Sequence, residues 1–461
     1  MFSRRRFLQS AAVTASSLIV PRALAQAACH QISVVSRVLE VKGRAAKVFG
    51  LEVAGSTQGL SMDYGGVFRA TVHNKLSEAT LVHWHGLTPP PVMDGVPMLS
   101  GPMIDAGQSR DYAFDTLRSG THWMHSHVGL QEQSLLAAPL IIRETGDKLV
   151  DEQEHVVMLH DFTFRDPAEI LAELQGGGGM HAGHDMAAMG GGMVSDIAYD
   201  AMLANDRTLD DPEVVQSEKA GRFKLRIING AAATNCWVDL GNIVGELIAV
   251  DGNAVYPVKG SRFPLGIAQR ADIRLALPAG SGAWPILFVA EGSGQRSGVV
   301  LRSGDGAVVK LADTGKVPEP VDLSLEVKLK SVAVPPETSV SRTEIVTLTG
   351  GGGDYVWGLN GKASMHDVIF NVREGERYEI VMQNLTGMAH PMHLHGHYFK
   401  VVGIDGKRIN GAIRDTVIVP VGAQVAIQFD ADNPGTWAFH CHHLYHMNAG
   451  MMGAIAYVNA A

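Results

Sequence analysis

The chain has 461 residues, of which 46% are hydrophobic and 18% are charged, and its formal net charge is −9. Such a length predicts about three domains, and the composition is that of a folded chain with a large core. The negative charge, without a long run of Lys or Arg, excludes a nucleic-acid-binding protein, because phosphate contacts need clustered positive charge.

Residues 1–25 predict an export signal. Residues 3–8 (SRRRFL) resemble a twin-arginine motif, and an apolar stretch continues to Val20. The Ala-Leu-Ala sequence at 23–25 is typical of a cleavage site and leaves Gln26 as the mature start. The apolar stretch is shorter than the roughly 18 residues that a membrane span needs, which disfavours the alternative of a single anchor. We therefore expect twin-arginine export to the periplasm and no membrane span after cleavage.

The chain has three cysteines, Cys29, Cys236 and Cys441, which are too few for a scaffold built from disulfides. Cys29 and Cys236 are compatible with either a disulfide or two buried free thiols. Cys441 differs from both because histidines flank it.

Three segments of the chain align without gaps. Each has an Asn followed twelve residues later by a Gly, and Asn74, Asn229 and Asn384 are separated by 155 residues in both intervals (229 − 74 and 384 − 229). The equal spacing indicates an internal repeat of domain length. A second landmark, a Trp shortly after a Gly, recurs in each copy, at 119–127, 281–289 and 434–443.

Short runs rich in Val, Ile and Phe lie between these landmarks, as at 68–72, 223–228, 378–382 and 416–419. Such runs, broken by Gly and Pro, are typical of strands, so we expect an all-β chain of three β-sandwich modules. The expected modules comprise residues 26–148, 149–315 and 316–461.

Four His-x-His pairs mark modules one and three. Residues i and i+2 of a strand face the same side, so each pair directs two imidazoles at one point. The corresponding positions of module two hold Val238 and Leu240, which predicts a spacer without metal. The pairs are His83/His85, His125/His127, His393/His395 and His440/His442.

Cys441 lies between the two histidines of the last pair, so the same alternation sends its sulfur to the opposite face of the strand. Cys441, His446 and Met451 follow at intervals of five residues on an expected strand and loop. They offer the thiolate, imidazole and weak thioether of a blue-copper centre. His390 supplies a second imidazole, although Pro391 leaves strict alternation open at this point.

The motifs HWHG (83–86), HWMHSH (122–127), HPMHLHGH (390–397) and HCHHLYHMNAGM (440–451) together resemble the copper motifs of multicopper oxidases. The resemblance covers the mature chain. It is closer to bacterial three-domain copper-tolerance oxidases and laccases than to two-domain copper nitrite reductases. It implies three cupredoxin-like Greek-key domains and four copper ions.

The resemblance also implies a role for each ligand. A type 1 copper accepts substrate electrons, which pass from Cys441 through the adjacent backbone to a type 2 copper and a type 3 pair, where dioxygen is reduced to two waters. The implied ligands are His390, Cys441, His446 and Met451 for type 1, His83 and His393 for type 2, and His85, His125, His127, His395, His440 and His442 for the type 3 pair.

The sequence offers a candidate residue for only one of the two expected proton routes. Asp94 matches the carboxylate that this family uses to handle protons near the type 2 copper, and its alternative interpretation is an ordinary turn residue. Met447 stands where close relatives often have another carboxylate, so another acid or a water chain is needed for the second proton route.

Residues 176–193 (GGGGMHAGHDMAAMGGGM) form a Gly-rich insertion at the start of module two. Thioether and imidazole favour Cu(I), which predicts Cu(I) recruitment; the alternative is a surface loop of biased composition. Met388 matches a residue near the cuprous site of copper-tolerance relatives, whereas Thr386 stands where an acid is expected. The candidate ligands are Met180, His181, His184, Met186, Met189, Met193 and Met388.

Three functions remain open: a Cu(I) oxidase in copper tolerance, a laccase-like oxidase of phenols and aromatic amines, and a non-enzymatic scaffold or copper-sequestering protein. The filled ligand positions disfavour the third. We expect dioxygen and either Cu(I) or a small phenol as partners, and a monomer. Four further histidines that flank the motifs are interpreted as packing or hydrogen-bonding residues: His73, His122, His397 and His443.

Overall fold

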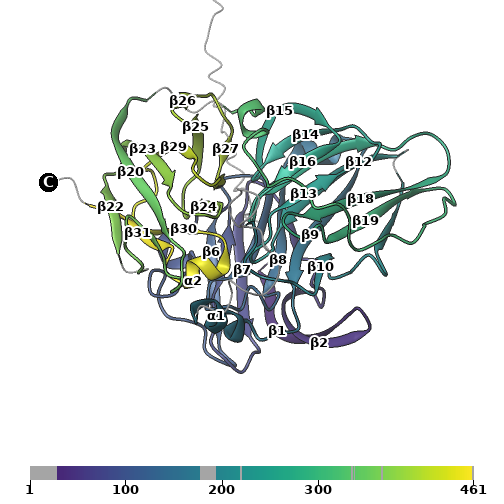
Figure 1. Ribbon diagram of the computed structural model, residues 1–461, viewed down its shortest axis with the longest axis horizontal. Coiled ribbons are helices and arrows are strands. Elements are labelled where there is room, and N and C mark those ends of the chain that lie inside the picture. The colour runs from purple at the N-terminus through teal and green to yellow at the C-terminus, as the bar shows by residue number, and fades with distance from the viewer. Residues whose placement is uncertain are drawn as a thin grey trace, which may run out of the picture.

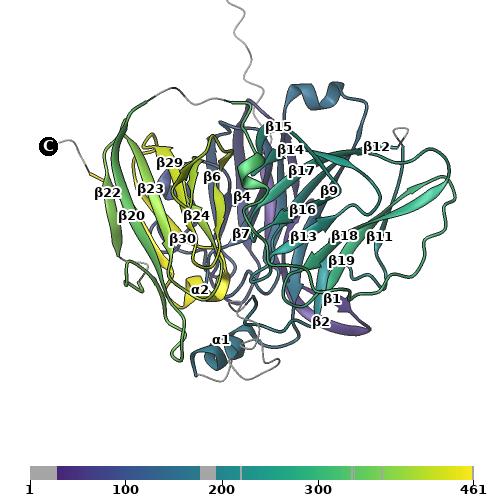
Figure 2. The ribbon, with the colours of Figure 1, turned by 45° about the horizontal axis from the view of Figure 1, so that its top comes forward.

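The computed structural model describes residues 29–176, 194–218, 221–333, 336, 338–364 and 367–458. The strands of these residues form six sheets, which fall into three consecutive pairs (Figures 1 and 2). The predicted all-β chain of three sandwiches is confirmed. The predicted boundaries at 148 and 315 fall in the connections between sheet pairs and stay predictions.

The two sheets of module one have the strand orders β2-β1-β4-β6 and β3-β8-β7-β5. In β4, Phe68, Ala70 and Val72 are buried and alternate with more exposed residues, as expected when one face of a strand lies in a core. The strands are β1 (His30–Val41), β2 (Arg44–Val53), β3 (Leu60–Asp63), β4 (Val67–Asn74), β5 (Val82–His85), β6 (Ser109–Asp115), β7 (Gly120–Ser126) and β8 (Ala137–Arg143).

Module two has the sheets β10-β9-β12-β17-β14-β15 and β11-β19-β18-β13-β16. Val238 and Leu240, at the positions that correspond to copper ligands, lie in its apolar core. The strands are β9 (Gln153–Phe162), β10 (Ala201–Ala204), β11 (Glu213–Gln216), β12 (Arg222–Asn229), β13 (Cys236–Asp239), β14 (Gly245–Val250), β15 (Asn253–Gly260), β16 (Arg262–Leu265), β17 (Arg270–Ala276), β18 (Gly282–Ala290) and β19 (Arg296–Ser303).

Module three has one sheet of β21-β20-β23-β29-β25-β26, with β27 beside β25, and a second of β22-β31-β30-β24-β28. The strands are β20 (Val340–Gly350), β21 (Trp357–Leu359), β22 (Val368–Val372), β23 (Arg377–Asn384), β24 (His390–Leu394), β25 (Phe399–Ile404), β26 (Lys407–Arg408), β27 (Ile413–Arg414), β28 (Thr416–Val419), β29 (Gln424–Asp430), β30 (Thr436–Cys441) and β31 (Met452–Tyr457).

The aligned asparagines Asn74, Asn229 and Asn384 end β4, β12 and β23. Each side-chain oxygen accepts a bond from the backbone N–H two residues later, and each amide donates to two backbone carbonyls or more. A buried amide side chain that satisfies backbone groups in this way holds the turn that leads into the next strand.

Strands of module one stand between the other two modules. In both views β6 and β7 lie between the yellow-green strands of module three and the teal strands of module two (Figures 1 and 2). β7 also contacts β12 and β17 of module two. Module one therefore meets both neighbours.

Two short helices lie close together at one edge of the molecule: α1 (Pro167–Gln175) and α2 (Leu444–Asn448) (Figures 1 and 2). Asp166 caps α1 by accepting a hydrogen bond from Ala168 N, and proline at the first helical position suits a helix start. Ile170 and Leu174, one turn apart, pack into the core of module three. Within the described residues, no helix is long and apolar enough to cross a membrane.

Candidate metal centre

The four His-x-His pairs meet between modules one and three. β5 pairs with β7 and sets His83 opposite His125, while β24 pairs with β30 and sets His393 opposite His440. All eight side chains are buried, none more than 5% exposed. We call this group the eight-histidine cluster. Its members are His83, His85, His125, His127, His393, His395, His440 and His442.

The cluster presents ring nitrogens that other groups leave unused. His440 Nε2 lies 2.9 Å from His395 Nε2 and 3.3 Å from His127 Nε2. A buried nitrogen without a partner costs free energy, so this donor set fits bound metal ions. Within the described chain, five more ring nitrogens of the cluster lack a hydrogen-bond partner: His83 Nε2, His85 Nδ1, His125 Nε2, His393 Nε2 and His442 Nε2.

Burial keeps these imidazoles in the form that binds metal. Burial, reinforced by neighbouring imidazoles, lowers the pKa of His85, His125 and His393 well below the ordinary histidine value. Burial also lowers the pKa of His440 to about 4. A neutral imidazole has a free lone pair for a metal ion.

Asp94 links a histidine of module one to a histidine of module three within the cluster. Its Oδ2 accepts a hydrogen bond from His395 Nδ1 at 2.8 Å. His83 Nδ1 donates to the Asp94 backbone carbonyl at 2.8 Å and lies 3.2 Å from Oδ1. Contacts to the nitrogen that faces away from the metal fix the ring orientation and the tautomer. Asp94 therefore lies where its predicted role requires, beside one expected type 2 ligand and one expected type 3 ligand.

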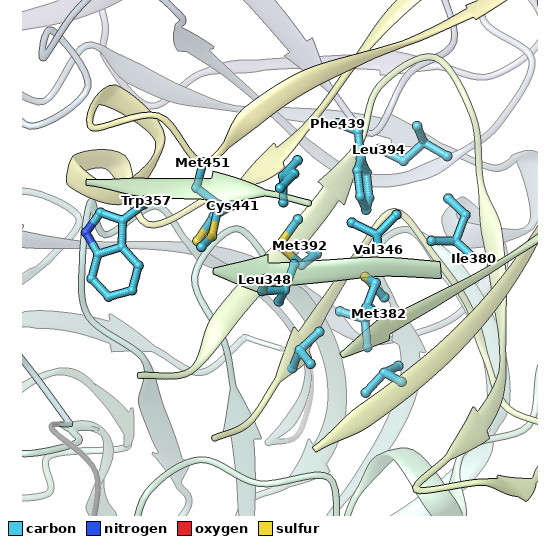
Figure 3. Close-up of a cluster of buried hydrophobic side chains, with 14 of the residues drawn as sticks. Val346, Leu348, Trp357, Ile380, Met382, Met392, Leu394, Phe439, Cys441 and Met451 are labelled. Atoms are coloured by element: carbon cyan, nitrogen blue, oxygen red, sulfur yellow. The ribbon is translucent and has the colours of Figure 1, made fainter. Parts of the chain in front are cut away.

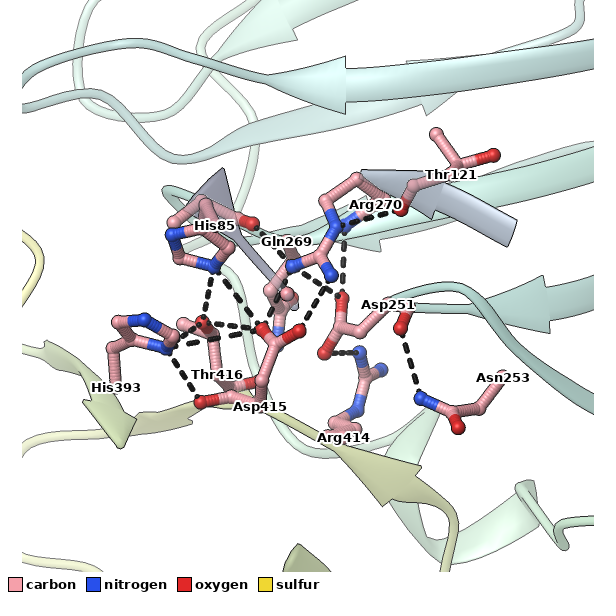
Figure 4. Close-up of polar contacts among 12 residues, drawn as sticks. His85, Thr121, Asp251, Asn253, Gln269, Arg270, His393, Arg414, Asp415 and Thr416 are labelled. Atoms are coloured by element: carbon pink, nitrogen blue, oxygen red, sulfur yellow. Dashed lines mark hydrogen bonds and ion pairs between the residues drawn. The ribbon is translucent and has the colours of Figure 1, made fainter. Parts of the chain in front are cut away.

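Asp415 makes an equivalent link. Its Oδ1 lies 3.1 Å from His85 Nε2, and its backbone carbonyl accepts a hydrogen bond from His393 Nδ1 at 2.8 Å (Figure 4). The same carboxylate forms a buried ion pair with Arg270. Sequence reasoning missed Asp415, because no motif spacing marks it; β28 brings it to the cluster by pairing with β24.

Glu132 makes the third link. It lies 2.8 Å from His125 Nδ1 and 3.8 Å from His442 Nδ1. Burial, followed by the nearby Asp161 charge, raises the pKa of Glu132 well above the ordinary value. Sequence reasoning missed it too, although its position five residues after His127 was a visible signal. Each of the three carboxylates thus joins a histidine of module one to a histidine of module three.

The second group of predicted ligands surrounds Cys441 within module three. Cys441 Sγ lies 3.5 Å from His390 Nδ1 and 3.9 Å from His446 Nδ1, and the two nitrogens are 3.2 Å apart. Met451 is buried beside Cys441, and Met392 packs nearby (Figure 3). We call this group the Cys441 site.

The local backbone of the Cys441 site agrees in part with expectation. The β24 register is regular from His390 to His393, so Pro391 does not break the alternation. The segment around His446 was expected to be a loop, and this was wrong. It forms α2, because the His443 side chain caps the helix by accepting from His446 N.

Module two covers the Cys441 site with Asp196. Asp196 Oδ2 lies 3.4 Å from His446 Nε2, its Oδ1 lies 3.3 Å from His443 Nε2, and Tyr355 donates a hydrogen bond to it. The Trp357 ring lies 4.0 Å from the His446 ring. Sequence reasoning missed Asp196, because its partners are far away along the chain.

The remaining predicted residues divide into three groups. Six candidate Cu(I) ligands between Met180 and Met193, and the export signal at 1–25, lie outside the described residues. Met388 is buried, and its backbone N–H donates to the hydroxyl of Thr386, which bonds to His390 Nε2 at 2.7 Å. Of the alternatives for the other cysteines, the described structure has two free thiols, with Cys29 exposed rather than buried and Cys236 buried.

The flanking histidines make local contacts. His73 bonds to Gln31 and Ser109, and His397 bonds to Tyr457. His122 contacts the Ser119 carbonyl at 3.3 Å, and His443 stacks on His446. These contacts agree with the interpretation as packing and hydrogen-bonding residues.

Known proteins of one family are similar to most of this chain. Residues 40–147 and 337–461 each match a multicopper oxidase family model. MmcO, a multicopper oxidase of Mycobacterium tuberculosis, is 30% identical over 410 residues that cover 84% of this chain and 79% of MmcO. Copper resistance protein A of Pseudomonas syringae pv. tomato is 26% identical, over 82% of this chain and 84% of that protein.

Among solved structures, a laccase from Botrytis aclada is similar with a TM-score of 0.74 and 21% identity, over 92% of this chain and 87% of the laccase. A likeness at this identity concerns the fold. It confirms the predicted cupredoxin-like architecture.

Proposed function

The chain belongs to the multicopper oxidase family, and we propose that it collects four single electrons from its substrate and uses them to reduce dioxygen to two waters. Family membership makes it a copper-dependent oxidoreductase. One observation supports the coupled reaction above others. β30 places Cys441 in one site while His440 and His442, its direct neighbours in the chain, belong to the other.

We assign four copper ions to the two groups of ligands. Copper held in this way supplies reversible one-electron chemistry and reacts with dioxygen. The free ring nitrogen is Nε2 in five of the six type 3 histidines and Nδ1 in His85. The grouping of these nitrogens favours a division of the six histidines into two sets of three. The assignment is His390, Cys441, His446 and Met451 for type 1, His83 and His393 for type 2, and His127, His395, His440 and His85, His125, His442 for the two type 3 ions.

The protein itself orients the ligands and handles protons. Asp94, Asp415 and Glu132 hold the imidazoles from behind and keep the free nitrogens directed inward. Asp94 stays the predicted proton-handling residue. Its Oδ1 has no hydrogen-bond partner within the described residues, and this is the atom at which we propose that a proton is held.

Asp196, Tyr355 and Trp357 cover the Cys441 site. This cover favours a small ion as substrate. His390 and His446 are both 0% exposed, so an aromatic ring does not reach their edges while the cover is in place. The Asp196 carboxylate lies 3.4 Å from His446 Nε2. A cation held near this carboxylate is well placed to pass an electron to the site.

The flanks of the Met- and His-rich insertion support Cu(I) as that ion. Before it, α1 packs Ile170 and Leu174 into the core around Cys441; after it, Ile197 joins the same core. In the sequence Asp196 lies between these two flanks, and its side chain contacts His446 of the Cys441 site. We therefore propose oxidation of Cu(I) to Cu(II) in the periplasm, with the insertion as the recruiting segment.

Oxygen consumption by the copper-loaded mature protein tests this proposal. The substrates are stabilised Cu(I) and a dimethoxyphenol. The variants are a deletion of 176–193 and a matched chain of unchanged length in which the Met and His residues of this segment become Ser. We expect fast uptake with Cu(I) that falls several-fold in both variants.

The other functions predict different results. Rapid uptake with the phenol and little with Cu(I) establishes the laccase-like function, which the family also contains. A protein that binds copper but consumes no oxygen with either substrate is a scaffold or a copper-sequestering protein. A fall in the deletion without a fall in the Ser variant assigns the insertion a packing role.

A further inference from the structure

Module two has none of the predicted type 1, type 2 or type 3 copper ligands, yet a residue from it reaches the eight-histidine cluster. Arg270, the first residue of β17, is 0% exposed. Its Nη1 donates to Asp415 Oδ1 at 2.7 Å, and its Nη2 donates to Asp415 Oδ2 at 2.5 Å (Figure 4). A bidentate pair of this kind fixes the carboxylate in both position and plane.

Asp415 transmits this geometry to two ligands. Its side chain contacts His85, and its backbone carbonyl accepts from His393. Thr416 adds a hydroxyl 3.3 Å from His85 Nε2 and 3.2 Å from His393 Nδ1. Module two also holds this residue, because Gln269 Nε2 donates to the Thr416 carbonyl at 3.1 Å.

Arg270 is itself held by all three modules. Its Nε donates to the Thr121 carbonyl of module one at 3.0 Å, and its backbone N donates to Asp251 Oδ1 at 2.9 Å. Asp251 Oδ2 accepts from Arg414 of module three at 3.0 Å. Burial opposes the charge of Arg270, but Asp415 and Asp251 outweigh it and raise the pKa of Arg270 above the ordinary arginine value.

The glycine that ends the HWHG motif makes room for this pair. A Cβ on Gly86 would lie 2.5 Å from Arg270 Nη2 and 3.0 Å from Asp415 Oδ2. The φ of Gly86 is +85°, which also disfavours any other residue. Module one is therefore shaped to accept the guanidinium of module two next to His85.

We propose that Arg270 is a positioning residue of the eight-histidine cluster. Through Asp415 it fixes the type 2 ligand His393 and the type 3 ligand His85. Module two is then required for the cluster to hold its copper. This role rests on the copper assignment of the proposed function.

A buried ion pair can also serve packing alone, and Arg226 provides the matched control. Arg226 is 1% exposed, lies in β12 of the same module, and donates to Thr121 Oγ1 at 3.0 Å and Asp272 Oδ2 at 2.8 Å. Within the described residues, its carboxylate partners are Asp147, Glu154 and Asp272. None of these three contacts a histidine of the cluster in the described structure.

The test compares Arg270→Lys, Arg270→Gln and Arg226→Lys in the full mature chain. Copper per chain is measured together with the blue absorption of the Cys441 site and the electron paramagnetic resonance of the type 2 copper. We expect both Arg270 variants to keep the blue absorption, to lose at least half of the cluster copper and to change the type 2 signal. Arg226→Lys keeps all copper and the wild-type signal.

Two results overturn the proposal. One is an Arg270→Lys protein with full copper and an unchanged type 2 signal; the other is equal copper loss in Arg226→Lys, which assigns the loss to loosened modules. If Arg270→Gln does not fold, Arg270→Lys decides. A wild-type protein with fewer than four copper ions contradicts the copper assignment instead, and the wild-type measurement alone reveals this.

Discussion

The eight-histidine cluster and the Cys441 site differ in what surrounds them. The cluster lies between modules, and the carboxylates of Asp94, Asp415 and Glu132 join its histidines across the boundary of modules one and three. Its geometry therefore depends on how the modules dock. Docking errors of a fraction of an ångström change the contacts that orient the rings.

The Cys441 site lies inside one module. Met392, Phe439 and Met451 belong to the same apolar core as Cys441 (Figure 3). Its nearby carboxylate in the described structure is Asp196, which acts from outside as part of the cover. We infer that core packing determines the Cys441 site and that polar contacts between modules determine the cluster, so each can be broken without the other.

The largest expected effect comes from Cys441→Ser. Loss of the soft thiolate removes the preferred ligand of the proposed type 1 copper, so oxidase activity and the blue absorption should fall to background. The copper proposed for the eight-histidine cluster should remain, because the carboxylates that orient the cluster do not depend on the sulfur. Metal analysis and absorption spectroscopy check this.

Cys236→Ser is the matched control, since Cys236 is a buried thiol in the core of module two. It is expected to keep copper and activity. Loss of cluster copper in Cys441→Ser would contradict the independence of the two sites.

Module two sharpens the comparison, because it has the same kind of fold but apolar residues at the positions that correspond to His83 and His85. Leu240 occupies the position that corresponds to His85 and is 1% exposed in an apolar core. Leu240→Ala is expected to cost about 2–5 kcal/mol of stability, since it leaves a cavity. Copper content should not change.

Thermal unfolding and metal analysis of Leu240→Ala beside His85→Ala separate the two effects. His85→Ala should lose cluster copper while the apolar core of module two stays intact. Equal copper loss in both variants would show that core packing of module two controls the cluster, contrary to the comparison.

These contrasts also explain what the sequence could predict. His83 and His85, like His393 and His395, share a strand face because of the two-residue period, so local spacing was sufficient to find them. The all-β fold followed from the short runs rich in Val, Ile and Phe, and its three modules from the aligned asparagines. Asp415 and Asp196 reach their histidines through strand pairing and module docking, and no local spacing encodes either process.

Helix α2, beside the Cys441 site, shows the same limit of prediction from local spacing. His446 was identified from its spacing to Cys441, whereas α2 was missed because the cap at His443 depends on side-chain geometry. A short helix of five residues has little periodicity to recognise.

Asp94→Asn tests the polar contacts of the cluster with a smaller expected effect. The amide keeps the shape of the carboxylate but removes the charge that faces His395 and His83. Activity should fall roughly 10- to 100-fold, as for other groups that orient metal ligands. The blue absorption should persist. Steady-state oxygen uptake measures the loss.

Asp105→Asn, at an exposed position of module one, is the control and should match the wild type. A variant of Asp94 with unchanged activity would leave the carboxylate without a role in orientation or in proton handling.

The smallest effect concerns His122, a buried histidine beside the cluster motif. Burial lowers the pKa of His122 to about 3, against about 6.5 in an unfolded chain. The unfolded state therefore binds more protons between these values, so the stabilising effect of keeping the imidazole neutral is complete above pH 6.5 and is lost as pH falls toward 3. From pH 7 to pH 5.5 the loss is about 1 kcal/mol.

In His122→Gln, with copper removed, this share of the acid destabilisation should disappear, and thermal unfolding at the two pH values measures it. The His73→Gln variant, which removes a histidine bonded to Gln31 and Ser109 near the surface, controls for the loss of an imidazole as such. Parallel acid slopes for wild type and His122→Gln would mean that His122 gains a proton without unfolding. The boundary of modules one and two, where His122 lies near Gly252, would then open more easily than the comparison of the two sites implies.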